Sequence, residues 1–279
     1  MKKKKKKDNN GLYSFIGLFL LIGIMIVVMI SLKVFDTSEK SKKEQFKMES
    51  RVEKVLDTEV SEKSSFKTIG WLRIEGTNID YPIVQSEERA SDFPVELESY
   101  AWSLNFDDKF HNMINIMGHN IYNLSSTPKL HSSKFKRLEE LMSFVYYDFA
   151  KDNRYMQLTI DGKDYIYKIF SVNFIASADT NSFPVVDDYS KEELKTQIDY
   201  YTKNSLYKYD VDVNEGDSLM SVVTCTRFFG NEQNYDFFVN GRLLRNGEEI
   251  DNYKVTTTKN YKNIEKKLKG DGNHEDDSL

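Results

Sequence analysis

Short stretches in which apolar and polar residues alternate recur along the middle of this chain, and they restrict its fold more than any other feature. The stretches 70–76 and 79–85 are separated by two turn-forming residues, and 155–160 and 165–172 are joined through an Asp-Gly pair. A period of two is typical of strands with one buried face, and Asp-Gly is a hairpin signal. Many short strands with few helices predict a mostly β fold, a barrel or sandwich with helical insertions.

Other elements complete this expected fold. Further strands are predicted at 115–122, 219–224 and 237–244, and a short helix over 138–144 followed by a strand over 144–148. The segment Ser190–Tyr201 begins with Ser-x-x-Glu and continues with apolar residues at helical spacing. This is a capping box followed by an amphipathic helix, placed before the only cysteine.

The first 35 residues have the charge pattern of a membrane anchor. Lys2–Lys7 is an unbroken basic run, and Gly11–Phe35 carries almost no charge. The apolar part, about 20 residues or roughly 30 Å as a helix, matches a bilayer core and is too long for a cleaved signal peptide. Because basic residues stay in the cytoplasm, we expect a single-pass membrane protein with its N-terminus inside and all residues after Phe35 outside the cell.

Charge and composition divide the rest of the chain. Residues 1–35 carry seven lysines and one aspartate, so the remainder has a formal net charge of −11 against −5 for the whole chain, which argues against nucleic acid as a partner. We expect five parts: a basic cytoplasmic tail (1–10), the transmembrane anchor (11–35), a charged helical stalk (36–65), a globular domain (66–248) and a disordered tail (249–279).

The only cysteine, Cys225, stands at the downstream end of the apolar run Leu219–Thr224. A free cysteine is often simply buried in a strand. In a strand that stays extended, however, Cys225 and Arg227 would share one face about 6.5 Å apart. A neighbouring guanidinium favours the thiolate, which is the nucleophilic form. The residues alone leave both interpretations open.

A cysteine nucleophile needs a partner for proton transfer, and the chain has four histidines. His274 lies in the expected tail, and His111 and His131 lie in polar loop sequence. His119 follows Gly118 at the end of a predicted strand, where a rigid element presents side chains to a cleft, although an isolated histidine is more often structural. No spacing of cysteine and histidine indicates a metal site, and we expect no cofactor.

Three features together resemble a sortase, one of the extracellular cysteine transpeptidases of Gram-positive bacteria. They are Met117-Gly-His-Asn120, Val223-Thr-Cys225 and the N-terminal anchor. The segment Gly70–Val84 and the helix at Ser190–Tyr201 resemble class B members specifically. The resemblance covers about 66–244. It implies a sortase-like β-barrel with an N-terminal helical stalk and a helix inserted before the cysteine strand.

The resemblance also implies a mechanism. The Cys225 thiolate would cleave the C-terminal sorting signal of a secreted protein at a Thr-Gly or Thr-Asn type bond, through a thioester acyl-enzyme. His119 would act as general acid and base. An amine of a peptidoglycan precursor, or a pilin lysine, would take the acyl group and so anchor the protein to the cell wall. Asn120, Val223 and Thr224 would bind the substrate.

The third catalytic residue of the family, an arginine that opens the last strand, is missing. Its place falls on or near Asp236, which cannot replace a guanidinium. We expect Arg227 to stabilise the oxyanion instead, because Arg242 lies roughly 20 Å further along the strand. Two other functions stay open: a class B-like pilin polymerase that forms isopeptide bonds, and a catalytically degenerate, membrane-tethered binding protein.

Overall fold

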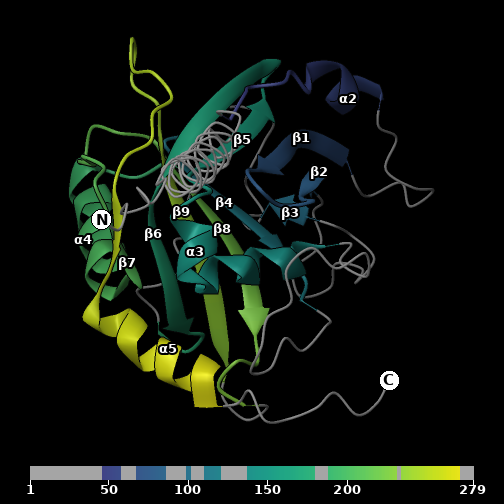
Figure 1. Cartoon of the computed structure of the whole chain (residues 1–279). Coiled ribbons are helices and arrows are strands. Elements are labelled where there is room, and N and C mark those ends of the chain that lie inside the picture. Colours follow the sequence, from purple (N-terminus) through teal and green to yellow (C-terminus); the bar gives the residue numbers. More distant parts are fainter. Residues whose placement is uncertain are drawn as a thin grey trace, which may run out of the picture. The chain divides into compact units, whose positions relative to one another are not determined.

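Eight strands form a closed barrel in the part of the chain that the computed structural model describes, residues 46–57, 67–85, 99–101, 110–120, 137–179, 188–230 and 234–270 (Figure 1). Their order is β1-β2-β3-β4-β8-β9-β6-β5, and pairing of β1 with β5 closes the barrel. The strands are β1 (Lys67–Ile74), β2 (Asp80–Gln85), β3 (Ser99–Ala101), β4 (Met113–Gly118), β5 (Tyr155–Ile160), β6 (Lys163–Ala176), β8 (Leu219–Thr226) and β9 (Tyr235–Leu243). The predicted mostly β barrel is therefore confirmed.

The hairpin between β5 and β6 follows directly from its two turn residues. Asp161 and Gly162 both have positive φ, 52° and 64°, as a type I′ turn requires. Ile160 and Lys163 pair directly on either side of them. The twist of this turn matches the twist of the flanking strands, so the Asp-Gly pair sets the register of the hairpin.

Two strands from distant parts of the chain lie side by side in parallel. β4 pairs with β8 from Met113 opposite Leu219 to Gly118 opposite Thr224. On its other side, β8 pairs with β9 in antiparallel orientation. The end of β8 that carries Cys225 is thus flanked by the end of β4 and the start of β9.

The helix α4 (Lys191–Asn204) covers one face of this part of the barrel. The Ser190 hydroxyl accepts a hydrogen bond from the Glu193 backbone at 3.3 Å, and the Glu193 carboxylate accepts one from the Ser190 backbone at 2.8 Å, so the predicted capping box is present. The core cluster beneath the helix joins helix and strand side chains: Leu194, Ile198, Tyr201, Met113, Phe170, Ile175, Leu219, Val223 and Phe238. The helix expected before the cysteine strand therefore packs on the sheet that carries it.

Two short helices precede β5. η2 (Leu138–Val145) is a 3₁₀ helix and α3 (Tyr147–Ala150) is an α-helix. The predicted strand over 144–148 is therefore wrong. Short apolar runs are ambiguous between helix and strand, and here the rings of Phe144 and Phe149 meet edge to face with centroids 5.0 Å apart.

The C-terminal segment 249–279 contains regular structure that the sequence analysis does not foresee. β10 (Val255–Thr257) pairs with β7 (Tyr207–Tyr209), and α5 (Lys259–Gly270) follows it. Tyr261 of α5 is buried. The expected disorder is wrong for these elements, because a few aromatic and apolar side chains find partners on the domain. The chain beyond α5 lies outside the described residues.

The chain divides into two compact units, Met1–Lys47 and Met48–Leu279. The predicted basic tail and anchor, residues 1–35, lie outside the described residues, and of the predicted stalk the described residues include 46–57, with α2 (Val52–Asp57) helical. Among the residues that are described, no helix is both long and apolar enough to cross a bilayer. The expected single-pass membrane location, with an extracellular domain, is corrected on this ground and is not retained.

Candidate active site

Cys225 lies one residue before the end of β8 and is exposed, whereas both neighbours are buried. Thr224 is 0% exposed, and its hydroxyl donates to the Gly118 carbonyl on β4 at 2.8 Å. Thr226 is 6% exposed, and its hydroxyl accepts a hydrogen bond from the Phe228 backbone at 3.1 Å, where the chain turns away. The two buried threonines hold the strand end in place, and the cysteine between them reaches solvent.

Strand pairing places three chemically different side chains in one row. Cys225 pairs with Asp236 on β9. The parallel register of β4 and β8 ends with Gly118 opposite Thr224, so its next step places His119 beside Cys225. Residues in register on neighbouring strands project from the same face, about 5 Å apart. Cys225 and Asp236 therefore lie side by side on β8 and β9. His119, one residue past the end of β4, comes next to Cys225 if this register continues by one step.

The surroundings raise the pKa of the Cys225 thiol. Although the residue as a whole is exposed, loss of water around its sulfur is the largest cause. The Asn120 backbone N–H donates to the sulfur and lowers the pKa, the Asp236 carboxyl raises it, and the Arg227 charge lowers it by less. The predicted influence of Arg227 has the right sign, but desolvation outweighs it, so thiolate formation requires a base.

Arg227 lies just beyond the end of β8, in a turn. The Gly230 backbone N–H donates to the Arg227 carbonyl at 2.9 Å, and β8 ends at Thr226. The extended strand that would place Arg227 on the same face as Cys225 is therefore not formed. The guanidinium is exposed, and its charge still reaches the thiol, since it contributes to lowering the Cys225 pKa.

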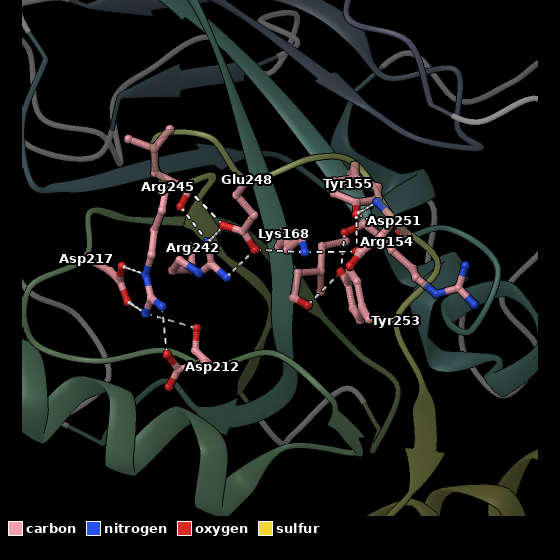
Figure 2. Close-up of polar contacts among 12 residues, drawn as sticks. Arg154, Tyr155, Lys168, Asp212, Asp217, Arg242, Arg245, Glu248, Asp251 and Tyr253 are labelled. Carbon is pink, nitrogen blue, oxygen red and sulfur yellow. Dashed lines mark hydrogen bonds and ion pairs between the residues drawn. The ribbon is translucent and has the colours of Figure 1, made fainter.

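Arg242, the alternative arginine, is buried at the other end of β9 and is already engaged. It pairs with Leu219, six residues along β9 from Asp236, which is roughly 20 Å at the rise of a strand. Its Nη2 donates to Glu248 Oε1 at 2.9 Å and its Nη1 donates to Oε2 of the same carboxylate (Figure 2). At this position along β9, Arg242 does not reach the thiol.

The three residues expected to bind substrate fall into two groups. Asn120 is half-buried, and its backbone contacts the sulfur of Cys225. Val223 belongs to the core cluster beneath α4, and Thr224 is buried with its hydroxyl already bonded. Because the Val223 side chain packs in this core cluster and the Thr224 hydroxyl is bonded to Gly118, the expectation for these two residues is corrected: they shape the strand that carries the thiol.

The sequence analysis notes Asp236 only because it stands where an arginine is expected, and it does not identify Ser177. Asp236 is 5% exposed, and burial raises the pKa of its carboxyl, while a hydrogen bond from the Ser177 side chain lowers it by less. Ser177 follows the end of β6, and no motif marks it. Within the described ranges, no group of three or more His, Cys, Asp or Glu side chains could hold a metal ion.

A closed barrel that presents an exposed thiol with a histidine beside it, at one strand end, has the parts of a cysteine acyltransferase site. Known structures identify the fold more closely. Sortase B of Clostridium perfringens aligns with a TM-score of 0.52 and 22% identity over 63% of this chain and 93% of its own. The Staphylococcus aureus sortase B–substrate complex aligns with a TM-score of 0.51 and 14% identity over 78% of this chain and 94% of its own.

A third structure, a sortase B complexed with triglycine, has a TM-score of 0.50 and 15% identity over 63% of this chain and 79% of its own. No family model matches the sequence, and no curated protein does. The fold of this chain is the class B sortase fold, as the sequence motifs predict.

Proposed function

We propose that this protein is a sortase-type cysteine transpeptidase whose catalytic domain lies within residues 66–248. The observation that carries the proposal is the parallel register of β4 with β8, which pairs Gly118 with Thr224 and so brings the next residues, His119 and Cys225, to neighbouring strand ends. A thiol and an imidazole on neighbouring strand ends are the pair that thiol-dependent acyl transfer needs. The raised pKa of the thiol makes the histidine more important, because a mostly protonated thiol has to give up its proton before it attacks.

In the first half-reaction, His119 accepts the thiol proton and the Cys225 sulfur attacks the carbonyl carbon of a Thr-Gly or Thr-Asn type bond. The carbonyl electron pair moves to oxygen, and Arg227 together with a backbone N–H next to Cys225 stabilises this oxyanion. One such donor is typically worth about 3–4 kcal/mol. The C–N bond then breaks as the His119 imidazolium protonates the leaving nitrogen, which leaves a thioester.

In the second half-reaction, an amine attacks the thioester, His119 accepts a proton from the attacking nitrogen, and the C–S bond breaks. The bound substrate of one structural neighbour and the triglycine of another support a sorting-signal peptide and an amine as the two partners. The acceptor we propose is an amine of a peptidoglycan precursor, which would anchor a secreted protein to the cell wall.

The test is to incubate the purified protein with a library of five-residue sorting peptides, with and without triglycine. We expect a Cys225 thioester in the mass spectrum without triglycine and a peptide–triglycine ligation product with it. The Cys225→Ala variant should give neither. If no peptide yields a thioester or product with the unmodified protein, the transpeptidase assignment fails and a binding protein on the same scaffold takes its place.

A further inference from the structure

The carboxyl group of Asp236 has no cationic partner among the residues that the structure describes. It is buried at the start of β9, and the interactions of this side chain in the structure are with the Ser177 side chain and with the Cys225 thiol. No lysine, arginine or histidine within the described ranges forms an ion pair with it. Buried carboxylates are normally paired with a cation, because removing them from water is costly.

Lys168 and Arg242, two other buried charges of this domain, follow that rule. Lys168 contacts Glu248 at 2.8 Å and Asp251 at 2.9 Å, and Arg242 donates twice to Glu248 (Figure 2). Asp236 differs from these groups because it has no ion-pair partner among the described residues, and it also differs in its position. It lies directly opposite Cys225, on the face from which the thiol reaches solvent.

The thiol of Cys225 has a different chemical group on each side. His119 is on the β4 side of Cys225 and Asp236 is on the β9 side. A group that approaches the carbonyl carbon of an acyl-Cys225 thioester from the β9 side therefore comes within a few ångströms of a carboxylate. Free amines are mostly protonated near neutral pH, because an α-amino group has a pKa near 8 and a lysine side chain a pKa above 10.

We propose that Asp236 binds the acceptor amine as an ammonium ion beside the thioester and takes its first proton. This proposal rests on the transpeptidase function and extends it to the recognition of the acceptor. The ammonium R–NH₃⁺ transfers one proton to the Asp236 carboxylate and becomes R–NH₂, whose lone pair attacks the thioester carbon.

The tetrahedral intermediate then loses a second proton to His119, and the C–S bond breaks with its electron pair on sulfur. The amide keeps the third hydrogen. His119 returns its proton to the sulfur, and Asp236 releases the other proton to solvent. One ammonium and one thioester thus yield one amide, one thiol and one free proton.

The first test needs no enzymatic turnover. Cys225 is modified with two methanethiosulfonates, one carrying a trimethylammonium group and one carrying a neutral methyl group, and the ratio of the two rate constants is measured. Both reagents react with the thiolate, so a change in the thiol pKa cancels in the ratio. Asp236→Asn should lower the ratio about three- to tenfold, the Coulomb effect of one charge at roughly 6 Å in partly aqueous surroundings.

Glu249→Gln is the matched control for the loss of one negative charge, since Glu249 is exposed beside Glu248 at the far end of β9. It should leave the ratio unchanged. Asp236→Ser serves as a second neutral variant if the asparagine variant does not fold. An unchanged ratio in a folded neutral variant overturns the proposal whether or not the protein is an active transpeptidase.

The second test uses the transfer step. Preformed Cys225 thioester is treated with triglycine, which is largely cationic at its amine at pH 7, or with hydroxylamine, which is largely neutral. Asp236→Asn should slow triglycine transfer at least tenfold and hydroxylamine transfer less than threefold. Equal slowing of both would overturn the proposal, while normal thioester formation in the same samples would leave the proposed function standing.

Discussion

Glu248→Gln tests the ion-pair network that engages Arg242 at the end of β9 opposite to Asp236. The Glu248 carboxylate contacts both Arg242, which is 2% exposed, and Lys168 at 2.8 Å. The substitution leaves the shape of the side chain nearly unchanged but leaves two buried cations without this counter-charge. Breaking a fully buried pair costs about 3–5 kcal/mol.

The expected loss here is smaller, for two structural reasons. The side chain of Glu248 is 24% exposed, and Lys168 keeps Asp251 as a partner at 2.9 Å. We therefore expect Glu248→Gln to lower the free energy of unfolding by about 2–3 kcal/mol at pH 7. Urea unfolding of the purified protein measures this change, and Glu249→Gln, an exposed neighbour, should change it by less than about 0.5 kcal/mol.

The difference in the free energy of unfolding between wild type and Glu248→Gln should also depend on pH. The hydrogen bond from Arg242 lowers the pKa of Glu248 well below its usual value, and burial opposes the shift by less. A carboxyl whose pKa is lower in the folded state stabilises the fold above its unfolded pKa, near 4.3, and this contribution is lost as the pH falls further. The difference between wild type and Glu248→Gln should thus be full at pH 7 and narrow between pH 5 and pH 3. Equal stability at pH 7, or a difference that stays constant down to pH 3, would refute the network argument.

Three further predictions concern the active site. His119→Ala should lower peptide cleavage at least about 10²-fold, as expected for a general acid and base, with an unchanged urea midpoint; near-normal cleavage would remove the histidine from the mechanism. Arg227→Ala should lower kcat/KM at least about 10²-fold, roughly 3 kcal/mol. Arg242→Ala should mainly lower the urea midpoint. A larger loss of kcat/KM in Arg242→Ala than in Arg227→Ala would give the oxyanion role to Arg242. Thr224→Val removes the buried 2.8 Å hydrogen bond to Gly118 and should destabilise the fold by about 1–2 kcal/mol; no change in the urea midpoint would mean that this bond does not hold the two strands together.

Local structure is well determined by the sequence because its causes are local. Alternation predicts β1, β2, β5 and β6, and the Asp-Gly pair predicts the turn between the last two, since the two positive φ values are a property of those two residues. The helix α4 follows from Ser190 and Glu193 in the same way. The short motifs around the cysteine and the histidine also predict the class of fold.

Segments whose structure depends on distant partners are predicted less well. The run at 144–148 is apolar enough for a strand. In the structure, however, it covers the end of η2 and the start of α3, and the rings of Phe144 and Phe149 meet edge to face. α5 has few apolar residues, and its Tyr261 is held by Tyr207, whose ring centroid is 5.2 Å away and which lies more than fifty residues earlier in the chain. A prediction from neighbouring residues cannot include a contact between residues so far apart in the chain.

By itself, the sequence determines which chemical groups are available to the site: one thiol, a histidine after a strand, and an aspartate at the position where the resemblance to sortases leads one to expect an arginine. The tertiary structure decides which of them meet. The parallel pairing of β4 with β8 brings His119 beside Cys225, and the antiparallel register of β8 with β9 puts Asp236 on the other flank of the thiol. A shift of one residue in either register would turn these side chains to opposite faces of the sheet, because the side-chain period of a strand is two.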